Sequence, residues 1–194
     1  MTRFFYDTEF IEAGPEHPIE LVSIGIVSDD GREFYAVSSE FDQRRLLSSQ
    51  WLRENVWTSL PTTPARQCRD GLPPHGHLDT DHPDVRSRAQ IARAVQAFIL
   101  GDAPRRPPEV ELWADYGAYD HVVLCQLFGS MVDLPQGMPM FTHDVQQEAS
   151  RLGVPYQDLP QQSEGLHNAL ADARNVRARV EYLEIWARHA DNDE

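Results

Sequence analysis

Two acidic residues near the start of the chain, Asp7 and Glu9, have the spacing that places both carboxylates on one face of a β-strand. Thr8, between them, and Phe10, after them, face the other way. Two neighbouring carboxylates repel each other, and each is costly to bury without a partner. A divalent cation held between them removes both penalties. On its own, the pair fits the polar face of an edge strand better than a metal site.

Two more aspartates, Asp120 and Asp172, lie near the N-terminal ends of segments with helical spacing. Asp172 stands four residues before Val176, and Asp120 precedes the apolar Val123 and Leu124. Each is therefore expected at the head of a helix, beside its buried face. The helix dipole alone can explain an acid there. With the strand pair, however, they make four carboxylates at one edge of a sheet, which would hold two hard cations about 3.5–4 Å apart.

A histidine, His167, lies five residues before Asp172. Five positions in a helix rotate by about 140°, so the two side chains cannot serve one site from the same helix. Asn168 is a favoured N-cap residue, which places the start of the helix after the histidine. We therefore expect His167 in the loop ahead of the helix, free to swing over the metals. A general base that takes a proton from an attacking water would sit there.

The elements that must position these residues follow from apolar periodicity and turn signals. The first forty residues predict an antiparallel meander of three strands, at 4–11, 20–27 and 33–37. A short buried strand is expected at 110–114. Helices are expected at 42–57, 87–100, 119–128, 142–152 and 168–189. The fold class is therefore α/β, with a mixed central sheet flanked by helices.

Two of these helices carry more specific expectations. Thr142 is expected to cap the helix at 142–152. The helix at 42–57 is expected to have one apolar side, formed by Leu46, Leu47, Trp51, Leu52 and Val56. The segment 60–84, rich in proline, is predicted to be a mobile surface loop. Its three histidines, His75, His77 and His82, could bind a metal, but nothing fixes their geometry, so the loop interpretation is preferred.

The composition predicts a single domain, 1–194, with 41% hydrophobic and 25% charged residues. All 17 basic residues are arginine, and the net charge of −14 argues against broad, tight binding of long nucleic acid. No segment reaches the ~20 apolar residues of a membrane helix, and the N-terminus does not resemble a secretory signal. We therefore expect a cytoplasmic protein whose cysteines, Cys68 and Cys125, are reduced.

The order of these motifs, which spans almost the whole chain, resembles the DEDDh exonuclease family. The motifs are Asp7-Thr8-Glu9 in the first strand, Tyr119-Asp120 at a middle helix, and His167-Asn-Ala-Leu-Ala-Asp172 at the last helix. The stretches FFYDTEFIE, IELVSIGIVSDDGREFYAVSSEFD, ELWADYGAYDHVVLCQLFG and HNALADARN are similar to bacterial polyadenylate-specific 3′-exoribonucleases. The resemblance implies an RNase H-like (exonuclease) fold, two Mg²⁺ or Mn²⁺ ions, a homodimer and single-stranded RNA as substrate.

The chain departs from the family pattern in its middle motif. Many relatives have His-Asn-x-x-Phe-Asp, whereas here the sequence runs from Asp115 through Tyr116 to Asp120. Asp120 is therefore assigned to catalysis, and Asp115 is a secondary candidate. The branch of the family that uses tyrosine as the base has it four residues before the last aspartate. Asn168 occupies that place, so the base is assigned to His167.

The resemblance implies a two-metal hydrolysis of the terminal phosphodiester. Asp7, Glu9 and Asp172 would hold the first ion, and Asp7, with Asp120 through water, the second. His167 would accept the proton of the attacking water, and the products would be 5′-mononucleotides. Substrate binding is assigned to Phe10, Thr8 and Tyr116. Phe10 could stack on the terminal base, but its direction away from the carboxylates fits core packing at least as well.

Three alternatives remain open from the sequence. A related nuclease could act on DNA 3′ ends or on very short oligonucleotides, for which a strongly negative protein is better suited. A second alternative is a non-catalytic module that binds nucleotides or RNA with the same fold. A third is a structural or interaction protein whose carboxylates are helix caps and solvated faces.

Overall fold

The structure is a computed structural model, and it describes residues 1–63, 75–101 and 109–190. In this part of the chain, six strands form one sheet in the order β6-β3-β2-β1-β7-β8. The predicted antiparallel meander is confirmed as β1 (Thr2–Ile11), β2 (Glu20–Ser28) and β3 (Glu33–Ser38). The parallel strands are β6 (Val85–Arg86), β7 (Val110–Ala114) and β8 (His143–Asp144). The expected mixed α/β fold is therefore confirmed.

The central strand β1 is much longer than its parallel neighbour β7. Strand β7 pairs with β1 only from Thr2 to Phe5, whereas β2 accompanies β1 to Ile11. The second half of β1, which carries Asp7 and Glu9, therefore has a free edge on the β7 side. The chain leaves the sheet there after Ala114 and enters helix α4, so a cavity can form beside that edge.

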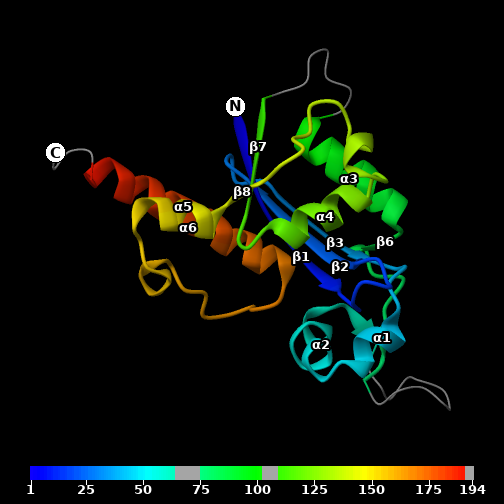
Figure 1. Cartoon of the computed structure of the whole chain (residues 1–194). Helices are drawn as coiled ribbons and strands as arrows, with labels where there is room; N and C mark the ends of the chain where they lie inside the picture. The colour runs from blue at the N-terminus through cyan, green and yellow to red at the C-terminus, as the bar shows by residue number, and fades with distance from the viewer. Residues whose placement is uncertain (64–74, 102–108, 191–194) are drawn as a thin grey trace.

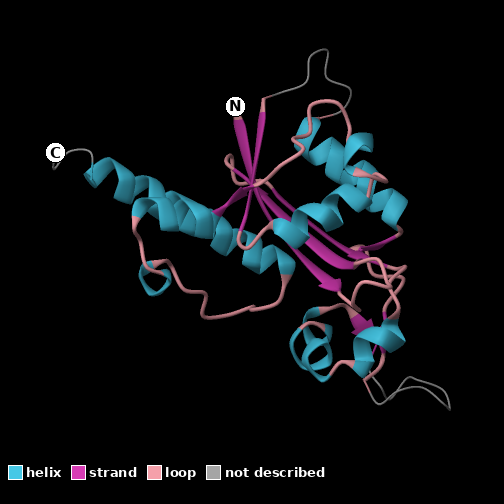
Figure 2. Cartoon of the chain, viewed as in Figure 1, coloured by secondary structure: helices cyan, strands magenta, loops and turns pink. Residues whose placement is uncertain are grey.

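Helices cover both faces of the sheet (Figures 1 and 2). Helices α3 (Arg88–Leu100) and α4 (Ala118–Gln126) pack on one face, and α5 (Val145–Leu152) and α6 (Ala169–Ala190) pack on the other. The side chains of β1 alternate between the two layers. Phe4 and Tyr6 join the core under α3 and α4, whereas Phe5 joins the core under α5 and α6. Successive residues of β1 therefore reach opposite sides of the sheet.

A glycine in β2 lets the start of α6 approach the sheet closely. A Cβ atom built on Gly25 would lie 2.3 Å from the backbone of Ala169, the first residue of α6. Any larger residue would push the helix outward. This contact places Asp172, in the first turn of α6, over the neighbouring strand β1, since Gly25 pairs with Asp7.

The expectation of one helix at 42–57 is wrong. The segment forms α1 (Gln43–Ser48), α2 (Gln50–Asn55) and the short 3₁₀ turn η1 (Trp57–Ser59). Ser49 is extended, with ψ at 118°, and its side chain caps α2, so the two helices have different axes. As a result, the predicted apolar side is divided: Leu46 and Val56 are buried, whereas Trp51 is 52% exposed.

The remaining helices follow the prediction with small shifts. Helix α3 begins with a capping box made by Ser87 and Gln90. The expected cap at Thr142 is wrong, because two residues of strand β8 intervene and Asp144 caps α5 through the backbone N–H groups of Gln146 and Gln147. The turns η3 (Met131–Asp133) and η4 (Tyr156–Asp158) complete the described elements. No described helix is long and apolar enough to cross a membrane.

The segment 60–84 contains short regular structure where it is described. Strand β4 (Thr62–Thr63) pairs with β5 (His77–Leu78) in a small second sheet. Residues 64–74, with Cys68, lie outside the described residues, whereas Cys125 is a buried free thiol. Over the described ranges, the one cluster of metal-ligating side chains lies elsewhere, so His75, His77 and His82 do not converge with other ligands.

Candidate active site

A cavity of about 460 Å³ lies beside the free edge of β1, between α4 and α6. All five predicted catalytic residues line it, together with the three predicted substrate-binding residues. The full set of lining residues is Asp7, Thr8, Glu9, Phe10, Asp115, Tyr116, Tyr119, Asp120, Tyr156, Gln161, Gln162, Leu166, His167, Asp172, Asn175, Val176 and Arg179. Because β7 does not extend along this part of β1, side chains from both faces of β1 can line the cavity.

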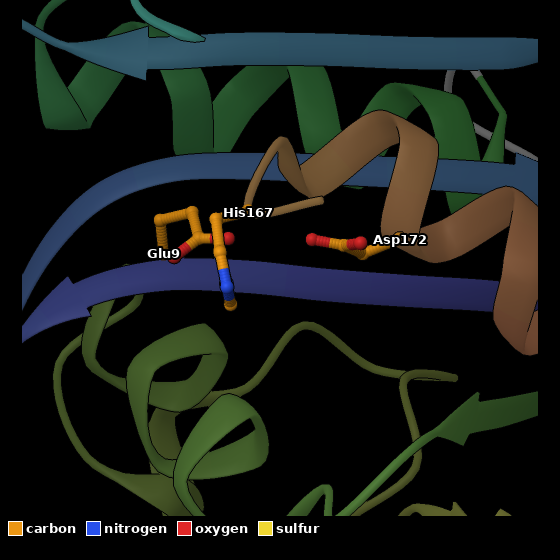
Figure 3. A group of neighbouring side chains, drawn as sticks. All are labelled: Glu9, His167 and Asp172. Atoms are coloured by element: carbon orange, nitrogen blue, oxygen red, sulfur yellow. The ribbon is translucent and has the colours of Figure 1, made fainter. Parts of the chain in front are cut away.

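Four carboxylates from three elements form what we call the acidic floor: Asp7, Glu9, Asp120 and Asp172. Figure 3 shows Glu9 of β1 and Asp172 of α6 directed toward a common space beside His167. One potential ligand atom from each of these three residues lies within 4.8 Å of the others. Glu9 is only 8% exposed, and Asp120 only 6%. The floor is thus a group of acidic side chains of which two are buried and two, Asp7 and Asp172, are partly buried.

Asp120 reaches the floor from the α4 side of the sheet. The backbone N–H of Thr8 donates to its Oδ1 at 2.9 Å, and the Thr8 hydroxyl donates to the same atom at 2.6 Å. Thr8 is itself 4% exposed. The predicted substrate-binding residue Thr8 thus uses its hydroxyl to fix Asp120 against β1.

Burial raises the pKa values of the whole acidic floor. Burial, followed by repulsion from Asp120, Glu9 and Asp172, holds the pKa of Asp7 well above its ordinary value. The pKa of Glu9 is raised to about 8, first by burial and then by the charge of Asp172. Burial raises the pKa of Asp120 to about 6, against the opposing effect of the Thr8 hydrogen bonds. The pKa of Asp172 is also raised by burial.

These residues fit a divalent metal. Several carboxylates buried together favour protonation unless a cation shares their space. Oxygen ligands from carboxylates are those that Mg²⁺ and Mn²⁺ prefer. The donors of Glu9, His167 and Asp172 are close enough to share an ion, and Asp7 and Asp120 lie beside them in the cavity.

His167 lies in a turn ahead of α6, as predicted, but it is held in place. Its backbone adopts the left-handed region, with φ at 61°. Its carbonyl accepts a hydrogen bond from the Ser59 hydroxyl at 2.9 Å, and its ring packs edge-on against Trp51 with the centroids 4.7 Å apart. Asn168 Oδ1 accepts the N–H of Ala171 at 3.1 Å, so the predicted cap is also present. The expectation of a freely swinging ring is therefore replaced by one supported by η1 and α2.

Asp115, the secondary candidate, is engaged by protein groups. Its Oδ2 accepts from the Arg179 guanidinium in an ion pair, and its Oδ1 accepts from Gln146 Nε2 at 2.7 Å. Both carboxylate oxygens therefore have partners on α5 and α6. Asp120, by contrast, has a second oxygen for which no described hydrogen bond exists, so it is better suited to hold an ion.

Aromatic side chains surround the opening of the cavity and form what we call the aromatic rim: Phe10, Tyr116, Tyr119 and Tyr156. The rings of Phe10 and Tyr119 stack at 5.8 Å with 13° between their planes. The three tyrosines are 67%, 47% and 49% exposed, respectively. Phe10 packs on the core under α4, as its predicted direction implied, and still lines the cavity because that cavity extends past the edge of β1.

Sequence reasoning did not assign the lining residues Tyr119, Tyr156 and Arg179 to the site, nor Trp51, which packs against His167. Tyr156 and Trp51 carry no signal in the sequence, because their segments join the site only through the fold. Arg179 carries one, since it lies three residues after Val176 and four before Leu183 within the apolar stripe of the last helix. A charged residue on a buried helix face indicates a buried partner.

Comparisons with known proteins show which family the chain belongs to. Two curated proteins of Mycobacterium tuberculosis, "3'-5' exoribonuclease Rv2179c" of strain H37Rv and "3'-5' exoribonuclease MT2234.1" of strain CDC 1551, are each 44% identical over 181 residues. The matches cover 93% of this chain and 92% of each relative. The profile of the 3′-5′ exoribonuclease Rv2179c-like domain matches residues 74–186. The chain belongs to the Rv2179c-like 3′-5′ exoribonuclease family.

Membership of the Rv2179c-like family confirms the expectation of an exoribonuclease enzyme rather than a structural protein. A solved structure titled "3'-end specific recognition of histone mRNA stem-loop by 3'-exonuclease" also aligns, with a TM-score of 0.49 and 14% identity. That alignment covers 94% of this chain and spans 63% of the other.

Proposed function

We propose that this Rv2179c-like protein is a metal-dependent 3′-5′ exoribonuclease of the DEDDh type, with an RNase H-like fold, that releases 5′-mononucleotides from single-stranded RNA. The observation that carries the proposal is the convergence of the acidic floor with His167. Asp7 and Glu9 come from β1, Asp120 from α4 and Asp172 from α6, and all line one cavity. This donor set matches the family resemblance residue by residue.

The acidic floor would hold two Mg²⁺ or Mn²⁺ ions, with Asp7, Glu9 and Asp172 around one and Asp7 and Asp120 around the other. Bound there, the ions would supply charge stabilisation and water activation for phosphodiester hydrolysis. The His167 imidazole accepts the proton of the attacking water. Its left-handed backbone and the Trp51 and Ser59 contacts orient the ring before substrate binds.

The aromatic rim would bind the terminal nucleotides. Base stacking on exposed rings suits single strands of any sequence, because every base has a flat face. Phe10 and Tyr119 offer one stacked platform, and Tyr116 and Tyr156 offer exposed rings on the neighbouring loops. Thr8 contributes indirectly by fixing Asp120. The net charge of −14 favours a short stretch of bound RNA. The proposed substrates therefore include both short oligonucleotides and the 3′ end of a polyadenylate tract.

The test is to incubate RNA labelled at its 5′ end with the protein and Mg²⁺, Mn²⁺ or EDTA, alongside Asp120→Asn. We expect a metal-dependent ladder that shortens from the 3′ end and is lost in the variant. Asp133→Asn is the matched control, because Asp133 is an exposed residue of η3 and does not line the cavity. Polyadenylate, mixed-sequence RNA of several lengths and matched DNA are compared in parallel. Preferential cutting of DNA, or metal binding without turnover on any substrate, would contradict the proposal.

We also propose that residues 1–194 act as one exonuclease domain and assemble as a homodimer. The dimer rests on the resemblance to homodimeric exoribonucleases. Light scattering after size-exclusion chromatography tests it, and a mass of one chain across the micromolar range would contradict it.

A further inference from the structure

A buried arginine forms part of the cavity wall. Arg179 lies in the middle of α6, is 6% exposed and lines the cavity that also contains the acidic floor. A buried cation is costly unless it is paired and hydrogen-bonded. The planar guanidinium can hold several acceptors at fixed angles, and here it contacts residues from two loops that are far apart in sequence.

The first contact is with the loop between β7 and α4. Arg179 forms its ion pair with Asp115, whose side chain is 14% exposed and whose other oxygen accepts from Gln146. The next residue, Tyr116, has φ at 55°, a conformation that an L-residue keeps only where its surroundings impose it. The Asp115 contacts hold the backbone immediately before Tyr116, and the Gly117 N–H, which donates to Asp144 Oδ2 at 2.7 Å, holds it immediately after.

The second contact is with the segment that leads into α6. The Arg179 Nε–H donates to the Pro160 carbonyl at 3.0 Å, and the guanidinium lies over the Tyr156 ring, 5.1 Å from its centroid. The described chain from 160 to 168 has no helix or strand, so contacts of this kind fix its path. One side chain therefore ties two walls of the cavity together, and each wall presents a tyrosine of the aromatic rim.

The catalytic residues have separate anchors. Asp120 is fixed by two hydrogen bonds from Thr8 on β1, and His167 by Ser59 and Trp51. These contacts do not involve Arg179. Loss of Arg179 should therefore loosen the two loop tyrosines while the groups that do the chemistry stay in place.

We propose that Arg179 is a positioning residue for substrate binding, because its contacts with Asp115, Pro160 and Tyr156 hold Tyr116 and Tyr156 in the lining of the cavity, where they bind the terminal nucleotide of the RNA. This inference rests on the proposed function for its substrate. It assigns Asp115 to the same structural unit rather than to the metal site.

The kinetic test compares Arg179→Gln, Asp115→Asn and the double variant on a short single-stranded RNA with saturating Mg²⁺. We expect each single change to raise KM about tenfold, comparable to the loss of one stacked base, with kcat within about twofold of the unaltered enzyme. The double variant should lose little more than Arg179→Gln alone, because that change already removes the ion pair that Asp115→Asn breaks. A fall in kcat at constant KM, or additive losses in the double variant, would overturn the proposal.

Matched variants separate positioning from folding. Arg177→Gln, two residues away on α6, removes an exposed pair with Glu181 and should leave KM unchanged. Tyr116→Ala and Tyr156→Ala alter exposed rings and should reproduce the KM rise even if Arg179→Gln does not fold by circular dichroism. Normal KM in both tyrosine variants would overturn the proposal.

Hydrogen exchange keeps this inference distinguishable from the proposed function. Arg179→Gln and the double variant should exchange the amides of 115–118 and 156–162 faster, with those of β1 unchanged. This measurement needs no turnover. An unaltered enzyme that does not degrade RNA would defeat the proposed function, whereas unchanged exchange in these two segments would defeat the role of Arg179.

Discussion

The acidic floor and the aromatic rim are built in different ways, although they share one cavity. The floor lies on regular elements, with two carboxylates on β1 and one at the head of each of α4 and α6. Three of the four rim residues lie outside the sheet, and two of them lie on turns or loops. A reaction centre needs positions fixed to fractions of an ångström, which regular elements provide. Substrate contacts tolerate more variation, and loops commonly carry them.

The comparison implies that damage to the floor should affect the chemical step, whereas damage to the rim should affect binding. A substitution that removes an interaction made only in the transition state lowers kcat. A substitution that removes an interaction made equally in the bound substrate and the transition state raises KM. Four measurements test this distinction between effects on the chemical step and effects on binding.

The largest effect is expected for His167→Ala. Loss of a general base typically costs about 10²–10⁴-fold in rate, so kcat should fall about 10³-fold with little change in KM. Steady-state kinetics on short RNA measures both. His189→Ala, an exposed residue in the last turn of α6, is the control. An unchanged kcat in His167→Ala would remove this residue from the chemistry.

Metal binding at the acidic floor should raise the free energy of unfolding of the protein, and the increase should be larger at higher pH. The folded pKa values of Glu9, about 8, and Asp120, about 6, exceed the ordinary values near 4 of an unfolded chain. The metal-free folded protein therefore retains protons that the unfolded chain has lost, and its free energy of unfolding falls as pH rises from about 4.5 to 8.

Thermal unfolding with EDTA or Mg²⁺ at pH 6 and pH 8 tests this prediction. A fixed Mg²⁺ concentration that is a hundred times the Kd at pH 8 adds about 2.7 kcal/mol to the free energy of unfolding at that pH. Protons compete with the metal at pH 6, so the increase in Tm should be larger at pH 8. Equal increases at the two pH values would show that the floor does not titrate in this range.

A smaller effect is expected for Phe10→Ala on the rim. The variant loses the ring stacked on Tyr119, and KM should rise about tenfold with kcat nearly unchanged. Phe10→Tyr should restore binding, because it keeps the flat face. Phe10 also packs on the core, so the Tm of both variants is measured alongside. A fall in kcat at unchanged KM would show that Phe10 acts in the chemical step, like the acidic floor, rather than in substrate binding.

The smallest effect is expected for Thr8→Val, which removes the hydroxyl that donates to Asp120. That hydrogen bond lowers the pKa of Asp120, so its loss should raise the pKa further. Protons then compete with metal at a higher pH, and the acid side of the kcat/KM profile should move upward by a fraction of a pH unit. Activity at neutral pH should fall about threefold, comparable to the loss of one hydrogen bond. Thr8→Ser keeps a hydroxyl and should restore the pH profile of the unaltered enzyme. If the unaltered enzyme, Thr8→Val and Thr8→Ser all have the same kcat/KM profile, the Thr8 hydroxyl does not tune Asp120.

The chemistry of the floor could be predicted from particular residues. The two-residue spacing of Asp7 and Glu9 sets their common face in any strand, and Asp120 and Asp172 precede apolar helical stripes. Asn168 marks the start of α6 and thus leaves His167 outside the helix. All of these signals are local, so they can be recognised in the sequence without knowledge of what packs against these residues.

The rim and the supports of the site could not be predicted in the same way. Trp51 was assigned to the apolar side of a single helix, but that helix is interrupted at Ser49, and the ring packs against His167. The direction of Phe10 was predicted, but its place in the cavity depends on where β7 ends. Asp115 was a secondary candidate for catalysis, and its partners on α5 and α6 could not be predicted from the sequence.

The sequence by itself determined which side chains can do chemistry here, since alternation along a strand and the signals at helix starts are properties of neighbouring residues. Only the tertiary structure decided what surrounds them. Three examples are the early end of β7 that opens the cavity, Gly25, which lets α6 approach β1, and Arg179, which joins two loops. Such contacts link residues far apart in the chain, and no local pattern encodes the distance between them.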